Sequence, residues 1–286
     1  MQKVTGQLSA DSVKALILRG ALPQSLLNFL GCALLRLILT TQGLGAFILI
    51  TLGTMCSKLG RARWLLRPMV VAQIARSGLD LLPMVTFLAA ALGLLVIGQT
   101  VSFLSRVGAN DYLGTVMVLV VVRELGPLLT ALLVLSRVGA ANVIELGTAR
   151  ALGEVEALEA LGIDPIHYLV VPRVIGMALG VFALTIYLLL GALASGYLWA
   201  YIQDVPLTPG QYAQQLASAM QGLDFVLIAL KTAFFGITIA TVTCYHGLAQ
   251  PLRLEEVSNA TIRAVAQCVV LCVLLDACFI VVYLLT

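Results

Sequence analysis

Five long apolar stretches alternate with short polar segments along this chain, and each is long enough to cross a bilayer as a helix, which takes about 20 residues. The pattern therefore predicts an all-α membrane protein with five transmembrane helices. Their expected bounds are residues 79–103, 112–137, 169–201, 223–246 and 264–285. Between the second and third helices, the segment 140–165 is too polar to span.

Another apolar stretch, at residues 37–57, is also long enough to span, but basic residues flank it on both sides. Four precede it and five follow it within residues 1–78, and the positive-inside bias disfavours a crossing there. We interpret it as an interfacial or re-entrant helix. The expected organisation is an amphipathic region over 1–78 on the cytoplasmic side, then a five-span domain over 79–286.

The distribution of Lys and Arg predicts the orientation. Counted outside the five expected spans, and with Arg137 and Arg173 at the ends of the second and third spans included, successive segments carry nine, one, three, no, two and no basic residues. Because basic loops stay in the cytoplasm, we expect the N-terminus inside, the C-terminus outside and the segment 137–173 inside.

Composition agrees with a membrane protein and excludes some functions. Of 286 residues, 60% are hydrophobic and 11% charged, against about 25% charged in a soluble domain. The net charge of +3 is too small to indicate nucleic-acid binding. Six cysteines lie in apolar stretches; Cys268 and Cys272 share a helix face without a nearby histidine, so we interpret them as packing residues and expect no metal site.

Four charged residues remain at membrane depth: Arg123, Glu124, Lys231 and Asp276. At 1.5 Å per residue, Lys231 and Asp276 lie about 12 and 14 Å from the outer ends of adjacent antiparallel spans, so they can form a pair. Arg123 and Glu124 point about 100° apart on their helix, and each needs a partner elsewhere. Pro127 cannot donate to the carbonyl of Arg123, which favours a kink.

Two interpretations of these charges stay open. In the first, they form an ion network that only holds the helices together, which suits Lys231 and Asp276. In the second, some of them line a polar route for a charged head group, which suits Arg123 because a guanidinium binds phosphate well.

Residues 147–162 predict a short amphipathic helix within the cytoplasmic segment. Gly162 suits its C-terminal cap, and Asp164 with Pro165 stops it. Its apolar stripe consists of Leu152, Val155, Leu158 and Leu161. Its acidic face consists of Glu154, Glu156 and Glu159. The helix either lies on the membrane surface or docks into the groove of a cytoplasmic partner.

No motif for autonomous chemistry occurs in the sequence. It contains no G-x-x-x-x-G-K-[ST] phosphate loop and no G-x-S-x-G nucleophile motif, and its two histidines are isolated. We therefore expect no catalytic residue and no bound cofactor in this chain. Any work must be driven by a partner protein or by an ion gradient.

The stretch from Arg123 to Arg173 resembles the MlaE (YrbE) permease family, the membrane subunits of MCE-type lipid ABC transporters. The matching motifs are Arg123-Glu124-Leu125-Gly126-Pro127, Arg137-Val138-Gly139-Ala140, Glu145-Leu146-Gly147-Thr148, Ala157-Leu158-Glu159, Gly162-Ile163-Asp164-Pro165 and Val171-Pro172-Arg173. The similarity extends more weakly from about residue 79 to the C-terminus.

This resemblance implies a multi-pass permease in the bacterial inner membrane that moves phospholipid or a related lipid. Its partners would be a second permease copy or paralogue, a cytoplasmic ATPase that binds ATP and Mg²⁺, and a periplasmic MCE-domain protein. The lipid cavity would lie between protomers, with Leu94, Ile97 and Leu104 on lipid tails and Arg123 and Glu124 in or behind its wall. The residues implied in ATPase coupling are Glu145, Arg150, Leu152, Glu154, Val155, Glu156, Leu158, Glu159 and Asp164.

Two rival functions remain. In a gradient-driven secondary transporter, Asp276, Lys231 and Glu124 would relay protons. A membrane scaffold without transport would need the four charges only for stability.

Overall fold

The computed structural model describes residues 42–54, 63–108, 112–202, 208–248 and 253–285. All regular elements in these residues are helices, which confirms the all-α prediction. Five helical runs are long and apolar enough to cross a membrane, as predicted. They are Arg67–Leu104, Leu113–Ala151, Ile166–Ile202, Gly222–Leu248 and Leu254–Leu285.

The chain divides into two units between residues 49 and 50. Within the stretch predicted as an interfacial or re-entrant helix, the described residues form a helix over Gln42–Thr54. Its 13 residues correspond to about 20 Å, less than the roughly 30 Å hydrocarbon core, so this helix alone does not span. The rest of the stretch predicted at 37–57, and residues 1–36, lie outside the described residues.

The first span begins before the predicted boundary at residue 78. It consists of α3 (Arg63–Ser77), the 3₁₀ turn η1 (Leu79–Leu81), α4 (Leu82–Leu92), the π-helical turn η2 (Gly93–Ile97) and α5 (Gly98–Val107). Ser77 donates a 3.2 Å hydrogen bond to the carbonyl of Gly176 in α10, and Gln73 lies against the same glycine. α3 therefore packs with the spans, and assigning all of 1–78 to a separate region is wrong.

The second span is one continuous helical run that passes the predicted end at residue 137. It comprises α6 (Leu113–Met117), η4 (Val118–Leu125), α7 (Gly126–Val134), η5 (Leu135–Gly139) and α8 (Ala140–Ala151), with η4 and η5 π-helical. Its 39 residues correspond to about 58 Å, nearly twice the hydrocarbon thickness. The helix therefore continues into the segment that is too polar to span.

The predicted helix at 147–162 is two helices in the structure. α8 ends at Ala151, Gly153 adopts a left-handed φ of 79°, and α9 covers Glu154–Ala160. A side chain at position 153 would be strained there, so the glycine ends one helix and starts the next. The predicted cap at Gly162 is confirmed: it has φ 74°, donates to the carbonyl of Glu159, and its neighbour Ile163 donates to Leu158, as in a Schellman motif.

The remaining spans follow their predicted ranges with longer ends. They are η6 (Ile166–Val170) with α10 (Val171–Ile202), α12 (Gly222–Leu248), and η7 (Leu254–Glu256) with α13 (Val257–Leu285). α13 starts before the predicted residue 264. Just ahead of it, the Glu256 carboxylate accepts a hydrogen bond from the backbone N–H of Arg253. α11 (Pro209–Ala219) is capped by Thr208, whose side chain accepts from the backbone N–H of Gln211, and burial raises the pKa of its Tyr212 to about 12.

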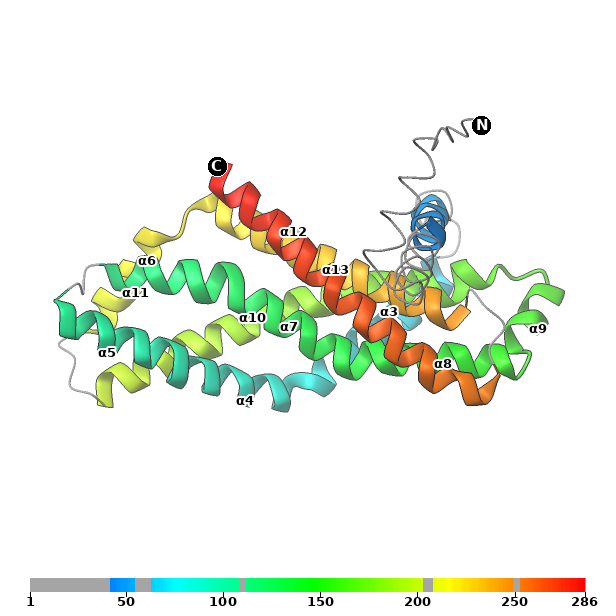
Figure 1. Cartoon of the computed structure of the whole chain (residues 1–286), viewed down its shortest axis with the longest axis horizontal. Helices are drawn as coiled ribbons and strands as arrows, with labels where there is room; N and C mark the ends of the chain where they lie inside the picture. Colours follow the sequence, from blue (N-terminus) through cyan, green and yellow to red (C-terminus); the bar gives the residue numbers. More distant parts are fainter. Residues whose placement is uncertain (1–41, 55–62, 109–111, 203–207, 249–252, 286) are drawn as a thin grey trace, which may run out of the picture. The chain divides into compact units, whose positions relative to one another are not determined.

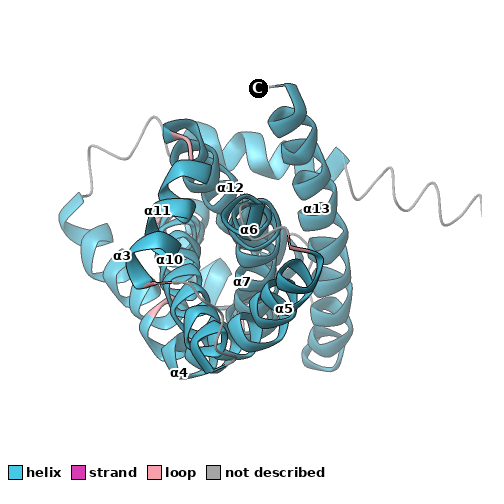
Figure 2. Ribbon diagram, turned by 90° about the vertical axis from the view of Figure 1, so that its left-hand side faces the viewer, coloured by secondary structure: helices cyan, strands magenta, loops and turns pink. Residues whose placement is uncertain are grey.

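α10 contacts α3, α4 and α12, and α12 in turn contacts α8 and α13 (Figure 2). The α10–α12 contact depends on a small residue, because a Cβ on Gly236 would lie 2.5 Å from the Cα of Ala178. α13 packs through Ala260, Ala264, Cys268 and Cys272, all buried, so the predicted packing role of these two cysteines is confirmed. Small residues let helix backbones approach closely in membrane proteins.

α9 and α11 lie at opposite ends of this helical unit, and α12 and α13 cross the α6–α8 run obliquely (Figure 1). α11 packs on α6, where a Cβ on Gly114 would meet the backbone of Gln215. The described polar helices α9 and α11 are thus at two ends, with the charged residues of η4, α12 and α13 between them.

Candidate functional site

Lys231 lies at the centre of a buried charge network. Its Nζ is 2.9 Å from Glu124 Oε2 and 2.7 Å from Asp276 Oδ1, and its side chain is fully buried. The three residues come from η4, α12 and α13, so one ammonium joins the second, fourth and fifth spans. The depth estimate from the sequence correctly placed Lys231 beside Asp276.

The π-helical turn before Pro127 supplies the third acceptor for Lys231. The Lys231 ammonium donates a 2.9 Å hydrogen bond to the backbone carbonyl of Arg123. This is the carbonyl that Pro127, four residues later, cannot bond because it has no N–H. Pro127 therefore converts a main-chain carbonyl into part of the site.

Arg123 is held by partners that the sequence did not reveal. Its Nη2 lies 2.9 Å from Asp224 Oδ1, and its guanidinium carbon stands 5.1 Å from the centre of the Tyr283 ring, at cation–π distance. Arg123 and Glu124 thus use different partners, as their orientation on one helix predicts.

Asp224 escaped prediction because it begins the fourth span. Counting at 1.5 Å per residue puts it about 3 Å from the outer end of α12 and Arg123 about 16 Å from the start of its own span. That comparison assumes parallel helices, whereas α12 crosses the second span obliquely (Figure 1). The pairing could have been predicted from the opposite charges of Arg123 and Asp224, provided that the tilt of α12 was taken into account.

When fully ionised, the network has two cations, Arg123 and Lys231, and three carboxylates, Glu124, Asp224 and Asp276. The excess negative charge is offset at Asp224. This residue lies in the first turn of α12 and accepts a 2.9 Å hydrogen bond from the backbone N–H of Gln221. Helix N-termini stabilise anions through their free N–H groups and dipole.

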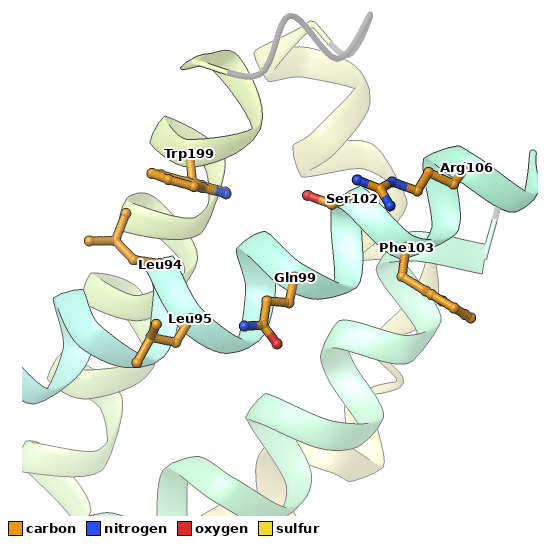
Figure 3. Close-up of a pocket in the computed structure, with 7 residues that line it drawn as sticks. All are labelled: Leu94, Leu95, Gln99, Ser102, Phe103, Arg106 and Trp199. Atoms are coloured by element: carbon orange, nitrogen blue, oxygen red, sulfur yellow. The ribbon is translucent and has the colours of Figure 1, made fainter.

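A separate hollow of about 530 Å³ opens beside α5, and we name it the α5 hollow. Figure 3 shows its lining residues. They are Leu94, Leu95, Gln99, Ser102, Phe103, Arg106 and Trp199. Apolar side chains and one guanidinium therefore share a single concave surface, while none of the five network residues lines it.

The structure separates the three predicted lipid-contacting residues. Leu94 lines the α5 hollow, and Leu104 is half-buried without lining it. The prediction for Ile97 is wrong: it is fully buried, because it packs onto Gly196 of α10, where a Cβ would come within 2.4 Å of it.

The four residues of the apolar stripe predicted within residues 147–162 differ in their exposure. Val155 is buried and Leu158 half-buried, but Leu152 and Leu161 are 62% and 75% exposed. The acids Glu154, Glu156 and Glu159 are all exposed. α9 therefore anchors through Val155 and leaves both leucines and its acidic face available.

Three other residues predicted for coupling have partners within the chain. Glu145 pairs with Arg76 and Arg173, each at 3.1 Å. Arg150 donates to the backbone carbonyl of Leu248 at the end of α12. Asp164 accepts a 3.1 Å hydrogen bond from the backbone N–H of Ile166, which starts the third span. These contacts hold α8 against α3, α10 and α12, and Asp164 caps the start of the third span.

Comparison with known proteins identifies the family. A family model described as "Permease MlaE" matches residues 70–282, most of the chain. A "Probable ABC transporter permease protein" of Rickettsia felis is 30% identical over 84% of this chain and 92% of its own length. The chain is also 30% identical, over 69% of its length and 56% of the other protein, to "Protein TRIGALACTOSYLDIACYLGLYCEROL 1, chloroplastic" of Arabidopsis thaliana.

The match begins within α3 and ends near the last turn of α13, so it includes all five spans and the whole charge network. This chain is a multi-pass membrane protein that belongs to the MlaE family of ABC transporter permeases.

Proposed function

We propose that this permease moves phospholipid or a related lipid between the bacterial inner membrane and a periplasmic MCE-domain protein, driven by a separate cytoplasmic ATPase. The observation that supports a lipid substrate most directly is the α5 hollow. Leu94, Leu95 and Phe103 suit acyl chains, and Arg106 at the same surface suits a phosphate. A substrate with an apolar body and an anionic head matches both parts.

The hollow is open, and its one-sided lining favours a second permease copy as the opposite wall. Arg123 and Glu124 keep 22% and 28% of their side chains exposed. They can therefore contribute to the wall of a shared cavity while Lys231 holds them from behind. Whether the second copy is identical or a paralogue does not change this role.

The energy source follows from α9. The chain has no phosphate loop in its sequence, and exposed Leu152 and Leu161 flank three exposed acids. Two apolar anchors with a negatively charged face fit a groove with basic edges. We assign that groove to the ATPase, which binds and hydrolyses ATP with Mg²⁺.

Relatives and topology complete the proposal. The plant relative's name refers to a diacylglycerol glycolipid, which supports a lipid of two acyl chains. The positive-inside count supports a cytoplasmic position for the α9 end and an outside position for the C-terminus. The MCE partner rests on the family resemblance.

Reconstitution tests the proposal. The permease, alone or with its ATPase, is placed in liposomes that contain a fluorescent phospholipid, and transfer to a soluble MCE domain is followed. Transfer that needs both ATP and the ATPase supports the proposal. Transfer by the permease alone under a pH gradient supports the secondary transporter instead. If Arg123→Ala with Glu124→Ala leaves lipid exchange normal, the scaffold interpretation is favoured.

A further inference from the structure

A second concave site lies between α3 and α8, near the junction of η5 and α8. It has a volume of about 350 Å³, and we name it the arginine pocket. Its lining includes Arg76, Asp80, Leu81, Arg137, Asn142 and Glu145. None of these residues lines the α5 hollow.

Arg137 is the distinctive residue of this pocket. Among the residues that the structure describes, no carboxylate lies within ion-pair distance of its guanidinium, although other arginines of this region are paired. Arg76 and Arg173 both bind the single carboxylate of Glu145, each at 3.1 Å. The lining itself has two arginines, Arg76 and Arg137, and two carboxylates, Asp80 and Glu145. Counted together with Arg173, which binds Glu145 but does not line the pocket, the cluster has three guanidinium groups and two carboxylates, which leaves one positive charge in excess.

The depth of Arg137 points to the lipid head groups. It follows Glu124 by 13 residues on one continuous helix, or about 20 Å along the axis. Half the hydrocarbon thickness is about 15 Å, so with Glu124 near the middle, Arg137 lies at the head-group level. Leu81 and Val138 form an apolar floor, being 3% and 8% exposed.

From these observations we propose that the arginine pocket binds the phosphate of an anionic phospholipid in the leaflet on the α9 side. The excess charge of this cluster, counted with Arg173, equals the charge of one phosphodiester, and the planar guanidinium of Arg137 can bind two of its oxygens. Basic pockets between membrane helices are suited to anionic head groups. The inference rests on the proposed function only in naming that leaflet as cytoplasmic.

The binding test needs neither ATP nor a partner, so its failure is distinct from failure of transport. The full chain, purified in detergent, is titrated with dioleoyl phosphatidylglycerol or dioleoyl phosphatidylcholine, and bound lipid is counted by native mass spectrometry. We expect preferential retention of phosphatidylglycerol, because the choline of the other lipid adds positive charge to the pocket. Arg137→Gln should weaken phosphatidylglycerol retention by about tenfold, and Arg137→Lys should weaken it less.

Two variants provide matched controls. Arg263→Gln removes an exposed arginine of α13 that hydrogen-bonds its own helix, and should leave retention unchanged. Arg106→Gln removes the cation of the α5 hollow, and the effect of Arg137→Gln should persist in that background. A thermal unfolding curve shows whether each variant is folded. If Arg137→Gln does not fold, Arg137→Lys, which retains the positive charge, is measured in its place.

Three results would overturn the proposal. The first is equal retention of the two lipids by the unmodified chain, and the second is equal loss in the Arg137 and Arg263 variants. The third is complete displacement of phosphatidylglycerol by inorganic phosphate, which would assign the pocket to a free phosphate rather than to a lipid.

Discussion

The Lys231 ammonium lies 2.9 Å from the backbone carbonyl oxygen of Arg123. The two residues are 108 positions apart in sequence and belong to different spans. Because Pro127 cannot bond this carbonyl, the lysine binds a main-chain acceptor and two carboxylates at once. Removing this one cation leaves several buried groups without a partner, and the first prediction follows from that.

Lys231→Met should destabilise the protein by about 3–5 kcal/mol, the range for breaking a buried ion pair by removing one partner. The measurement is thermal or denaturant unfolding in detergent. Neutralising the carboxylates as well, with Glu124→Gln and Asp276→Asn, should recover part of the loss. If the triple variant is less stable than Lys231→Met by the sum of the separate effects, the three residues do not form one network.

Asp224→Asn should lower stability by about 1–3 kcal/mol, since it weakens a charged hydrogen bond between the buried Asp224 carboxylate and the partly exposed Arg123. The amide keeps the shape of the side chain, so the loss reports charge. Glu255→Gln, at an exposed acid, serves as the control and should change little. In a double-mutant cycle, Arg123→Gln should cost less in the Asp224→Asn background, and strict additivity would rule out the pairing.

Gly236→Val should disrupt the contact between α10 and α12, where a Cβ has only 2.5 Å to the Cα of Ala178. Overpacking of this kind costs about 1–3 kcal/mol or more. Gly210→Ala is the control, because nothing lies within 4 Å of a Cβ there and alanine favours its helix. The two unfolding temperatures should move in opposite directions, and an unchanged or higher unfolding temperature for Gly236→Val would contradict the close packing.

Leu94→Trp and Ile97→Ala should separate the α5 hollow from the core beneath it. Tryptophan at position 94 fills the hollow, so we expect slower lipid transfer with little change in unfolding temperature. Alanine at position 97 leaves a cavity beside Gly196 and should cost about 2–5 kcal/mol. Unchanged transfer in Leu94→Trp would remove the α5 hollow from the substrate path.

Reversing the charges of Glu154, Glu156 and Glu159 to lysine should lower co-purification of the ATPase with this chain. All three side chains are exposed, so the fold should tolerate the change, as circular dichroism can show. Glu255→Lys, at the same end but outside α9, is the control. Co-purification that stays unchanged in the triple variant would exclude these acids from docking.

Much of the fold could be predicted, because hydropathy and charge report which residues lie in lipid. The lengths of the helices could not, since hydropathy marks the embedded part of a helix and not its end. The second span shows this: its helix continues through α8 to Ala151, although the apolar signal stops near residue 137. Likewise, Gly153 divides the coupling segment through its left-handed φ, which periodicity alone does not reveal.

The site was predictable where charge gave a signal and hidden where it did not. Buried charges require partners, so Lys231 and Asp276 could be paired from depth alone. Leu94 and Ile97 are equally apolar, and a helix that is apolar all round does not show which face meets lipid and which meets another helix. Only the packing of Gly196 against Ile97 distinguishes them.

The unbroken run from Leu113 to Ala151 also acts as a lever arm. At about 58 Å in length, a tilt of about 5° applied where α8 meets α9 displaces the opposite end by roughly 5 Å. That end begins at Leu113, next to α11, and the backbone carbonyl of Arg123 belongs to the same helical run. A small angular change at the α9 end would thereby become a lateral shift at the Leu113 end, and the contacts of Arg150, Glu145 and Lys231 along the run would have to yield to it.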